Sequence, residues 1–153
     1  MEFLEKDLEQ IIFETDNELL RNVGFDIHGY KIRQLRIGNY GIADLVTWYR
    51  YGEVISITIY ELKKGHINID ALYQALRYRK GIERYFKHRG SKFMVDISII
   101  LVGSKVDTST SFIYLADYVF QLSMYTYQYK INGLSFKSNY GYSLLEEGFT
   151  KKI

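Results

Sequence analysis

The sequence predicts an α/β protein built on a mixed central β-sheet of five or six strands, with α-helices packed against it. Residues 54–62 and residues 95–102 are almost continuously apolar, which is typical of central, buried strands. An amphipathic stretch of helical period lies between these two runs, and this strand–helix–strand order implies a right-handed crossover between parallel strands. Asn132 and Gly133 form a strong hairpin signal, which adds an antiparallel pair of strands as a C-terminal extension.

The N-terminal part of the chain is expected to form one helix and two strands. Apolar residues recur near helical spacing over residues 3–21, and Gly24 supplies a stop for this first amphipathic helix. Residues 30–37 and residues 42–51 carry strand-like patterns, and the glycine-containing segment 38–41 separates them. We therefore expect two strands before the first fully apolar one.

The C-terminal part is expected to contain two more helices and the hairpin. Asn68 is a suitable N-cap for a helix that continues to about residue 88 with apolar residues along one side. A short helix is expected over residues 110–118. The strand expected at residues 121–131 then leads through the hairpin turn into a last strand over residues 134–137.

Aromatic residues are abundant, with 15 tyrosines and 9 phenylalanines. The alternating strand of the hairpin places four apolar residues on one face: Tyr125, Tyr127, Tyr129 and Ile131. We favour the interpretation that this strand is half-buried and packs on the core. Two alternatives stay open, because aromatic platforms can stack on DNA bases of any sequence and the same face could form an edge or dimer surface.

Length and composition limit the class of protein. A chain of 153 residues matches the usual size of one domain, so residues 1–153 are expected to form a single domain. No apolar run approaches the roughly 20 residues of a membrane helix, and the acidic N-terminus does not resemble a secretion signal. We therefore expect a cytoplasmic protein with no membrane partner. Because the chain has no cysteine, any metal must be bound through oxygen or imidazole.

Opposite charges are concentrated in two segments of the chain. Residues 1–20 carry seven acidic residues and one lysine, whereas residues 77–92 carry seven lysines and arginines and one glutamate. A basic stripe along a helix is the electrostatic footprint of a polyanion contact, although a charge run is also typical of a solvated helix face. The basic residues predicted to bind nucleic acid are Lys64, Arg77, Arg84 and Lys87.

Three charged residues lie at the ends of otherwise apolar strands. Glu61 and Lys63 are two residues apart, so they project from the same side of their strand, about 6.6 Å apart along it. Asp44 lies in the neighbouring antiparallel strand, which can bring its carboxylate beside that of Glu61. Two carboxylates and a main-chain carbonyl, such as that of Leu62, suffice to bind a hard Mg²⁺ or Mn²⁺ ion. Such an ion polarises a phosphate and acidifies a bound water, while Lys63 orients that water or stabilises transition-state charge.

Each of these residues also has an ordinary structural explanation. Glu-x-Lys at a strand end is a frequent exposed charge pair, and a single Asp near a turn often bonds local backbone. The combination is more informative, because charge at the end of an apolar strand is costly unless it is paired or bound to a metal. Gln74 and Tyr78 are four residues apart and share a helix face, where a tyrosine is more often part of the core.

These residues follow one another in the order found in a known group of enzymes. The chain resembles the PD-(D/E)xK nucleases, and within them the RecB-like branch and the catalytic domain of the NucS (EndoMS) mismatch endonucleases. The resemblance runs from residue 5 to about residue 86, and its pieces are Glu5-Lys6-Asp7-Leu8 with Ile12-Phe13-Glu14, Gly41-Ile42-Ala43-Asp44, Tyr60-Glu61-Leu62-Lys63-Lys64 and Gln74-Ala75-Leu76-Arg77-Tyr78. It implies a restriction-endonuclease-like fold, in which helices flank the mixed sheet.

The resemblance also implies a role for each matching residue. Asp44 and Glu61 would be ligands of a Mg²⁺ or Mn²⁺ cofactor, and Lys63 would be the catalytic lysine. Gln74 and Tyr78 would support the site near the scissile phosphate. The first helix would contribute one acid that reaches the site, for which the candidates are Glu5 and, as the alternative, Glu9.

The leading prediction is therefore a metal-dependent deoxyribonuclease with DNA as its partner. For a nuclease of this size that cuts both strands, we expect a homodimer, with one site for each strand. Two other classes of function stay open. One is a nucleic-acid-binding module that keeps the fold without cleaving, and the other is a protein-interaction factor that uses the C-terminal tyrosines.

Overall fold

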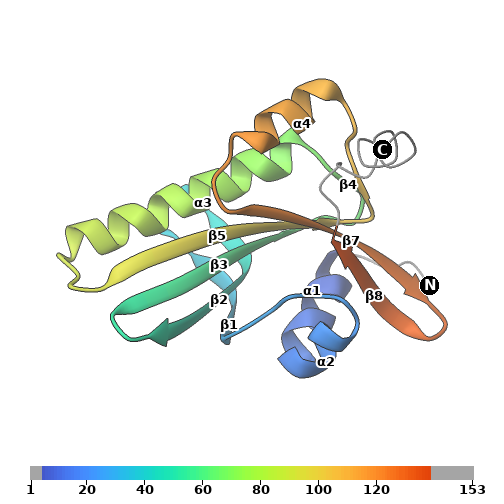
Figure 1. The fold of residues 1–153 in the computed structure, drawn as a ribbon, viewed down its shortest axis with the longest axis horizontal. Coiled ribbons are helices and arrows are strands. Elements are labelled where there is room, and N and C mark those ends of the chain that lie inside the picture. Colours follow the sequence, from blue (N-terminus) through green and yellow to red (C-terminus); the bar gives the residue numbers. More distant parts are fainter. Residues whose placement is uncertain (1–4, 139–153) are drawn as a thin grey trace, which may run out of the picture.

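The computed structural model describes residues 5–138, which form a six-stranded mixed β-sheet with helices on its faces (Figure 1). The strand order is β1-β2-β3-β5-β7-β8, which confirms the predicted α/β class, the mixed sheet and the C-terminal hairpin. Along the chain the elements are α1 (Glu5–Glu14), α2 (Asn17–Asn22), β1 (Tyr30–Arg36), η1 (Gly38–Tyr40), β2 (Ile42–Tyr51), β3 (Val54–Leu62), β4 (His66–Ile67), α3 (Ile69–His88), β5 (Met94–Gly103), β6 (Lys105–Val106), α4 (Thr110–Asp117), β7 (Leu122–Lys130) and β8 (Gly133–Ser138).

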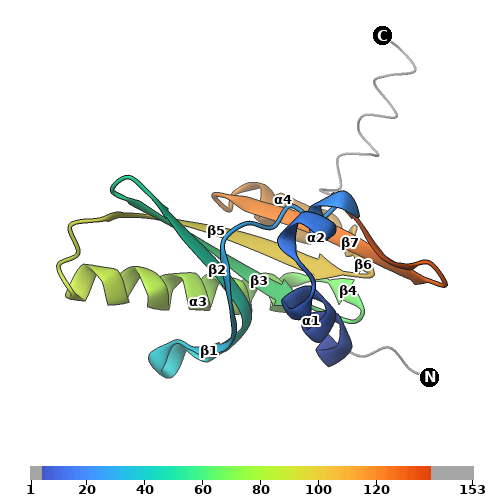
Figure 2. The ribbon, with the colours of Figure 1, turned by 90° about the horizontal axis from the view of Figure 1, so that it is seen from below.

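Strand β3 is apolar on both sides because a helix covers each of its faces. On one face Leu62 packs in a cluster with Leu8 and Ile12 of α1. On the other face Ile59 packs in a cluster with Ile82 of α3. Successive side chains of a strand point to opposite faces, so a strand between two helices needs an unbroken apolar run. Figure 2 shows α3 running along the strands.

The crossover from β3 through α3 to β5 is parallel, as the sequence predicts. The pairing runs without interruption from Val54 opposite Met94 to Leu62 opposite Val102. Helix α3 begins where predicted, because the Asn68 side chain accepts a hydrogen bond from the Ala71 amide at 3.3 Å. Among residues 5–138, no helix is both long and apolar enough to cross a membrane.

The prediction of one continuous helix over residues 3–21 is wrong within the described residues. Helix α1 ends at Glu14 and α2 begins at Asn17. Lys31 of β1 explains the break, because its ammonium donates to the main-chain carbonyls of Ile12, Phe13 and Thr15 at the end of α1. The carbonyls that a continuing helix would use are thereby satisfied from another element, and the chain is free to turn.

A second, two-stranded sheet was not predicted from the sequence. Strands β4 and β6 pair in parallel, with His66 opposite Lys105 and Ile67 opposite Val106. Strands of two residues are too short to show an alternating pattern, so nothing in the sequence marks them. This pair links the segment after β3 to the segment after β5, at the end of the sheet where the charged residues were predicted.

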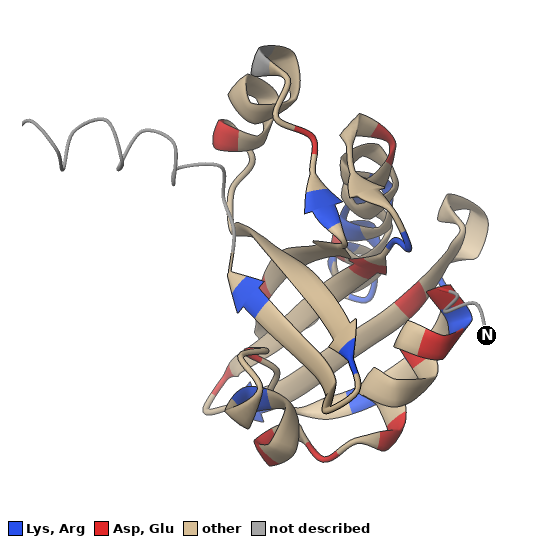
Figure 3. Ribbon diagram, turned by 90° about the vertical axis from the view of Figure 1, so that its right-hand side faces the viewer, with Lys and Arg blue, Asp and Glu red and all other residues tan. Residues whose placement is uncertain are grey.

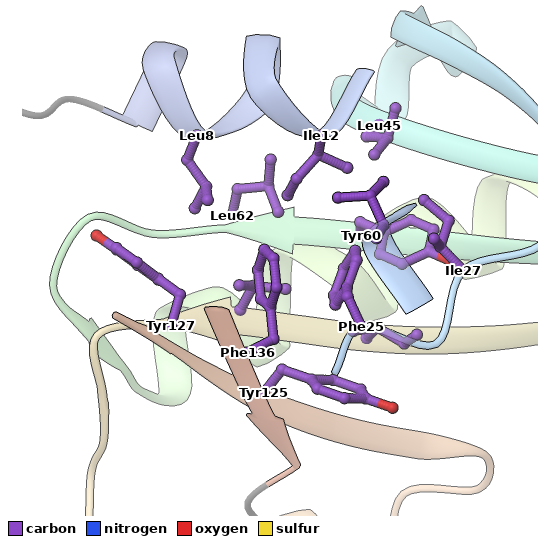
Figure 4. Packing of buried hydrophobic residues seen from close by; sticks show 13 residues of the cluster. Leu8, Ile12, Phe25, Ile27, Leu45, Tyr60, Leu62, Tyr125, Tyr127 and Phe136 are labelled. Carbon is purple, nitrogen blue, oxygen red and sulfur yellow. The ribbon is translucent and has the colours of Figure 1, made fainter. Parts of the chain in front are cut away.

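An aromatic core joins the N-terminal segment to the C-terminal hairpin (Figure 4). The Phe25 ring stacks on Phe136 at a centroid distance of 4.3 Å and meets Tyr125 edge-on at 5.3 Å. Tyr127 is also buried, which confirms the half-buried strand. Tyr129 is exposed, and Ile131 is fully exposed in the turn, so the predicted apolar face ends before the hairpin tip. Aromatic pairs of this geometry are worth about 0.5–1.5 kcal/mol beyond their buried area.

We expect Gly24→Ala to unfold the junction between α2 and the hairpin. Gly24 has φ +96°, and an added Cβ would overlap the carbonyl oxygen of Phe136. The main chain is fixed there, since the Phe136 amide donates to the Val23 carbonyl at 2.8 Å. Left-handed strain plus a backbone clash should lower the free energy of unfolding by about 2–4 kcal/mol, measured by urea titration.

Gly65→Ala is the matched control for this substitution. An added Cβ at Gly65 meets nothing within 4 Å, and the residue has no left-handed φ. The control should change the free energy of unfolding by less than about 0.5 kcal/mol. Equal urea midpoints for the two variants would show that the contact between Gly24 and Phe136 is not close.

Candidate active site

Asp44 and Glu61 lie opposite each other on neighbouring antiparallel strands. The register of β2 and β3 pairs Leu45 with Tyr60, so the next position along each strand brings Asp44 and Glu61 together. Residues directly opposite in such a pair have Cβ atoms about 5 Å apart and point to the same face. The prediction that the two carboxylates share one side of the sheet is therefore consistent with the register.

Lys63 joins this pair from the position directly after β3. Its ammonium nitrogen lies 3.4 Å from Glu61 Oε1 and donates to Gln74 Oε1 at 3.0 Å. The main chain at Lys63 is fixed to the next strand, because its amide donates to the Val102 carbonyl at 2.8 Å. Gln74 comes from the second turn of α3, so strand and helix together hold the lysine.

Tyr78 lies one helical turn beyond Gln74 and is almost completely buried. It packs against Gly41, directly before β2, where an added Cβ would stand 3.0 Å from Tyr78 Cε1. Gly41 has φ +119°, a conformation that favours glycine. Burial, followed by the negative charges of Glu61 and Asp44, raises the pKa of the Tyr78 hydroxyl, so this group stays protonated at neutral pH.

The charged form of the Glu61 side chain is strongly disfavoured by its surroundings. Only 4% of the residue is exposed, and its second carboxylate oxygen, Oε2, has no hydrogen-bond partner. Burial first, and then repulsion from Asp44, raise the pKa of Glu61 to about 7, although Lys63 acts in the opposite direction. A buried carboxylate oxygen without a partner is the kind of group that a cation would satisfy.

The charged form of Asp44 is also disfavoured. Burial and then the charge of Glu9 raise the pKa of Asp44, while the Leu62 amide donates to it and lowers that pKa. The site thus gathers two destabilised carboxylates around a single ammonium group. The donors fit a hard divalent cation, although no cluster of three or more His, Cys, Asp or Glu side chains occurs among residues 5–138.

Both acids of α1 that were candidates for the site lie near it. Glu5 is exposed and accepts a hydrogen bond from the Lys64 amide at 3.2 Å, next to Lys63. Glu9 is buried and accepts from Arg33 Nε at 3.1 Å and from Gln34 Nε2 at 2.7 Å. Figure 3 shows acidic residues on α1 and on the strand that runs beside it.

Arg33 and Gln34 were not recognised from the sequence. Gln34 lies in β1 between Arg33, which pairs with Leu45, and Leu35, which pairs with Ala43. Its φ of +53° is rare for a residue other than glycine. Such strain persists only where surrounding contacts impose it, and here the bond to Glu9 does so. The sequence gives no signal for it, because a lone glutamine in a strand is usually a solvated side chain.

The residues predicted to bind nucleic acid are all exposed. Lys64 follows the site directly, and Arg77 precedes Tyr78 on α3. Arg84 lies seven residues beyond Arg77 and therefore shares its face of the helix, with Lys87 one turn further on. Their side chains therefore lie at the surface, where a polyanion can approach them.

Comparison of the chain with protein-family models, with curated proteins and with solved structures gave no match.

We expect the stability of the protein to fall as the pH rises through the titration of Glu61. The folded-state pKa of Glu61, about 7, lies above its ordinary value of 4.5, so the folded protein binds more protons than the unfolded chain between these values. Stability from this group is complete below about pH 4.5 and is lost as the pH approaches 7. Glu61→Gln should therefore exceed the wild type in free energy of unfolding at pH 8 by about 3 kcal/mol.

Urea titrations at pH 5 and pH 8 measure this difference, and Glu83→Gln, at an exposed position of α3, is the control. The control should track the wild type at both pH values. A wild type that gains stability relative to Glu61→Gln between pH 5 and pH 8 would show that Glu61 is favourably paired in its charged form.

Proposed function

We propose that this protein is a metal-dependent deoxyribonuclease that hydrolyses DNA phosphodiester bonds at Asp44, Glu61 and Lys63. The observation that carries this proposal is the buried, unpartnered oxygen of Glu61 beside a second carboxylate. An ammonium group lies 3.4 Å from the other oxygen of Glu61. The order of these residues along the chain resembles that of the PD-(D/E)xK nucleases, which supports the same reaction.

Asp44, Glu61 and the main-chain carbonyl of Leu62 would hold the cation, which we propose is Mg²⁺ or Mn²⁺. Oxygen ligands suit hard cations, and two carboxylates are enough when waters and substrate phosphate complete the coordination. Burial raises the pKa of both carboxyl groups, and negative charge adds to it, from Glu9 at Asp44 and from Asp44 at Glu61; a positive charge beside the two carboxylates opposes these effects. When bound, the cation supplies electrophilic activation of the phosphate and a water that ionises near neutral pH.

Lys63 would orient the attacking water or stabilise the charge that develops on the phosphate. An ammonium group has three N–H donors, and Glu61 and Gln74 accept at most two of them. The remaining donor is available to the water or to a phosphate oxygen. Gln74 acts through Lys63, so we assign it as a positioning residue. Tyr78 would present a protonated hydroxyl to the same phosphate.

The exposed cations would bind the DNA backbone on either side of the scissile phosphate. Lys64 adjoins the site along the chain, while Arg77, Arg84 and Lys87 follow α3 away from it. Contacts of this kind release counterions, so binding should weaken steeply with salt.

A catalytically silent nucleic-acid-binding module is the second candidate. Lys63 already pairs with Glu61, and residues 5–138 contain no cluster of three metal-ligating side chains. A silent module would bind DNA with the same salt dependence and would not turn it over with any divalent cation. Turnover therefore separates the two candidates, whereas binding does not.

The nuclease proposal is tested by incubating the purified protein with single-stranded, duplex and branched DNA in Mn²⁺ or Mg²⁺. We expect cleavage of at least one substrate, and a loss of at least about 100-fold in Asp44→Asn and in Lys63→Met, since each removes a group that acts in the transition state. Gln74→Leu should lose about tenfold, because Lys63 remains but is less well placed. Glu83→Gln should cleave like the wild type. Cleavage that survives in Asp44→Asn and Lys63→Met would refute the assignment.

Binding of the cation is tested without any substrate. Mn²⁺ should raise the melting temperature of the wild type more at pH 8 than at pH 6, because Glu61, with a pKa of about 7, must lose its proton to bind the ion. The apparent affinity should be about tenfold lower at pH 6. Glu61→Gln should show no pH-dependent shift. A shift of equal size in the wild type and in Glu61→Gln would place the ion elsewhere.

A further inference from the structure

A large apolar trough lies between α3 and the part of the sheet formed by β1 and β2. Its volume is about 790 Å³, within the range of about 300–1,000 Å³ that is usual for ligand sites. The residues that matter for its chemistry are Tyr40, Trp48, Arg84, Tyr85, Phe86 and His88. We refer to this feature as the apolar trough.

The apolar trough begins a short distance from the carboxylate cluster along both β2 and α3. Val46 lies two residues beyond Asp44 on β2, which places it on the same face and about 7 Å further along the strand. On α3, Ile82 and Tyr85 lie four and seven residues beyond Tyr78, so they belong to the same helix face. A strand of DNA with its phosphate at Asp44 would therefore meet the trough within the next nucleotide or two.

The lining of the trough combines flat aromatic walls with a basic rim. Its walls include Trp48, which is 38% exposed, and Tyr85, which is 52% exposed. The rim carries Arg36, Arg84 and His88, and none of its lining residues is acidic. Exposed aromatic rings beside arginines form the combination that stacks on a nucleobase while the cations contact its phosphate.

A second copy of the chain fits this lining less well. In a two-fold symmetric contact the same patch meets itself, so the basic rim would face the basic rim. Arg36 and Arg84 would then approach like charges, and the lining offers no carboxylate to offset them. A polyanion that carries flat apolar rings would contact the apolar walls through its rings and the basic rim through its negative charges.

We propose that the apolar trough receives an unpaired nucleobase of the strand that is cut, adjacent to the scissile phosphate. This inference rests on the proposed nuclease function and adds its substrate class: DNA with unpaired nucleotides, such as single strands, flaps and frayed ends. A fully paired base keeps its faces stacked inside the duplex and cannot enter the trough. Stacking on Trp48 and Tyr85 would hold the strand in place while the phosphate reaches Asp44 and Glu61.

Trp48 reports directly on the occupation of the trough, because it is the only tryptophan of the chain. The wild type in EDTA, where no cleavage interferes, is titrated with an oligothymidylate of about 12 nucleotides and with a blunt DNA hairpin. We expect the oligothymidylate to quench the Trp48 fluorescence and the fully paired stem to leave it nearly unchanged. An unchanged Trp48 signal at saturation, with binding followed by anisotropy of a labelled oligonucleotide, would overturn the proposal.

Tyr85→Leu and Tyr51→Leu form a matched pair of variants. Both tyrosines are 52% exposed, but Tyr51 lies outside the trough. Loss of one stacking partner should weaken oligothymidylate binding by Tyr85→Leu at least about fivefold, and Tyr51→Leu should bind like the wild type. Arg84→Gln should also weaken binding and lessen its dependence on salt. Equal affinities of the Tyr85 and Tyr51 variants would overturn the proposal.

The outcomes separate this inference from the proposed function. Cleavage by the wild type with Mn²⁺ but no response of Trp48 would refute the trough and leave the nuclease. A Trp48 response and a weakened Tyr85→Leu without any cleavage would support the trough and refute the nuclease. A Trp48 emission that shifts with protein concentration in the absence of DNA, together with dimers in sedimentation, would assign the trough to a second copy and overturn the proposal.

Discussion

The register between β2 and β3 is the constraint on which the rest of the site depends. Leu45 faces Tyr60 in the core beneath α1, and this apolar pair fixes the alignment of the two strands. The next position along each strand then holds Asp44 and Glu61. A slip of one residue would move Leu45 out of the core and carry the carboxylate to the other face. Burial of apolar side chains therefore holds two carboxylates side by side, although Asp44 disfavours the charged form of Glu61.

The carboxylate cluster and the apolar trough are both unfavourable in the isolated chain, and they are adjacent. The cluster holds a buried oxygen of Glu61 without a partner, and the trough leaves Trp48 and Tyr85 partly open to water. Strand β2 and helix α3 contribute residues to both features. A single-stranded nucleic acid would contact both at once, with a phosphate at the cluster and a base in the trough. The aromatic core around Phe25 and the hairpin lies on the other face of the sheet, where it supports α1 and its acids.

The sequence predicts most of this fold because its elements are long and strongly periodic. Strands β2 and β3 and helix α3 have the predicted bounds, and the spacing of two residues brings Lys63, directly after β3, beside Glu61. The break after α1 could not be predicted, since apolar spacing continues through it and its cause, Lys31, lies in another element. Two further features depend on tertiary contacts, which leave no local pattern in the sequence. They are the hydrogen bonds from Arg33 and Gln34 to Glu9 and the left-handed φ of Gln34.

The most direct test of the central claim is a crystal structure of the protein soaked with Mn²⁺, with the ion located by anomalous diffraction. The account predicts one strong peak between the carboxylates of Asp44 and Glu61, within bonding distance of both and of the Leu62 carbonyl, with Lys63 beside it. A saturating soak that gives no peak at these groups, or that leaves Glu61 paired only with Lys63, would contradict it.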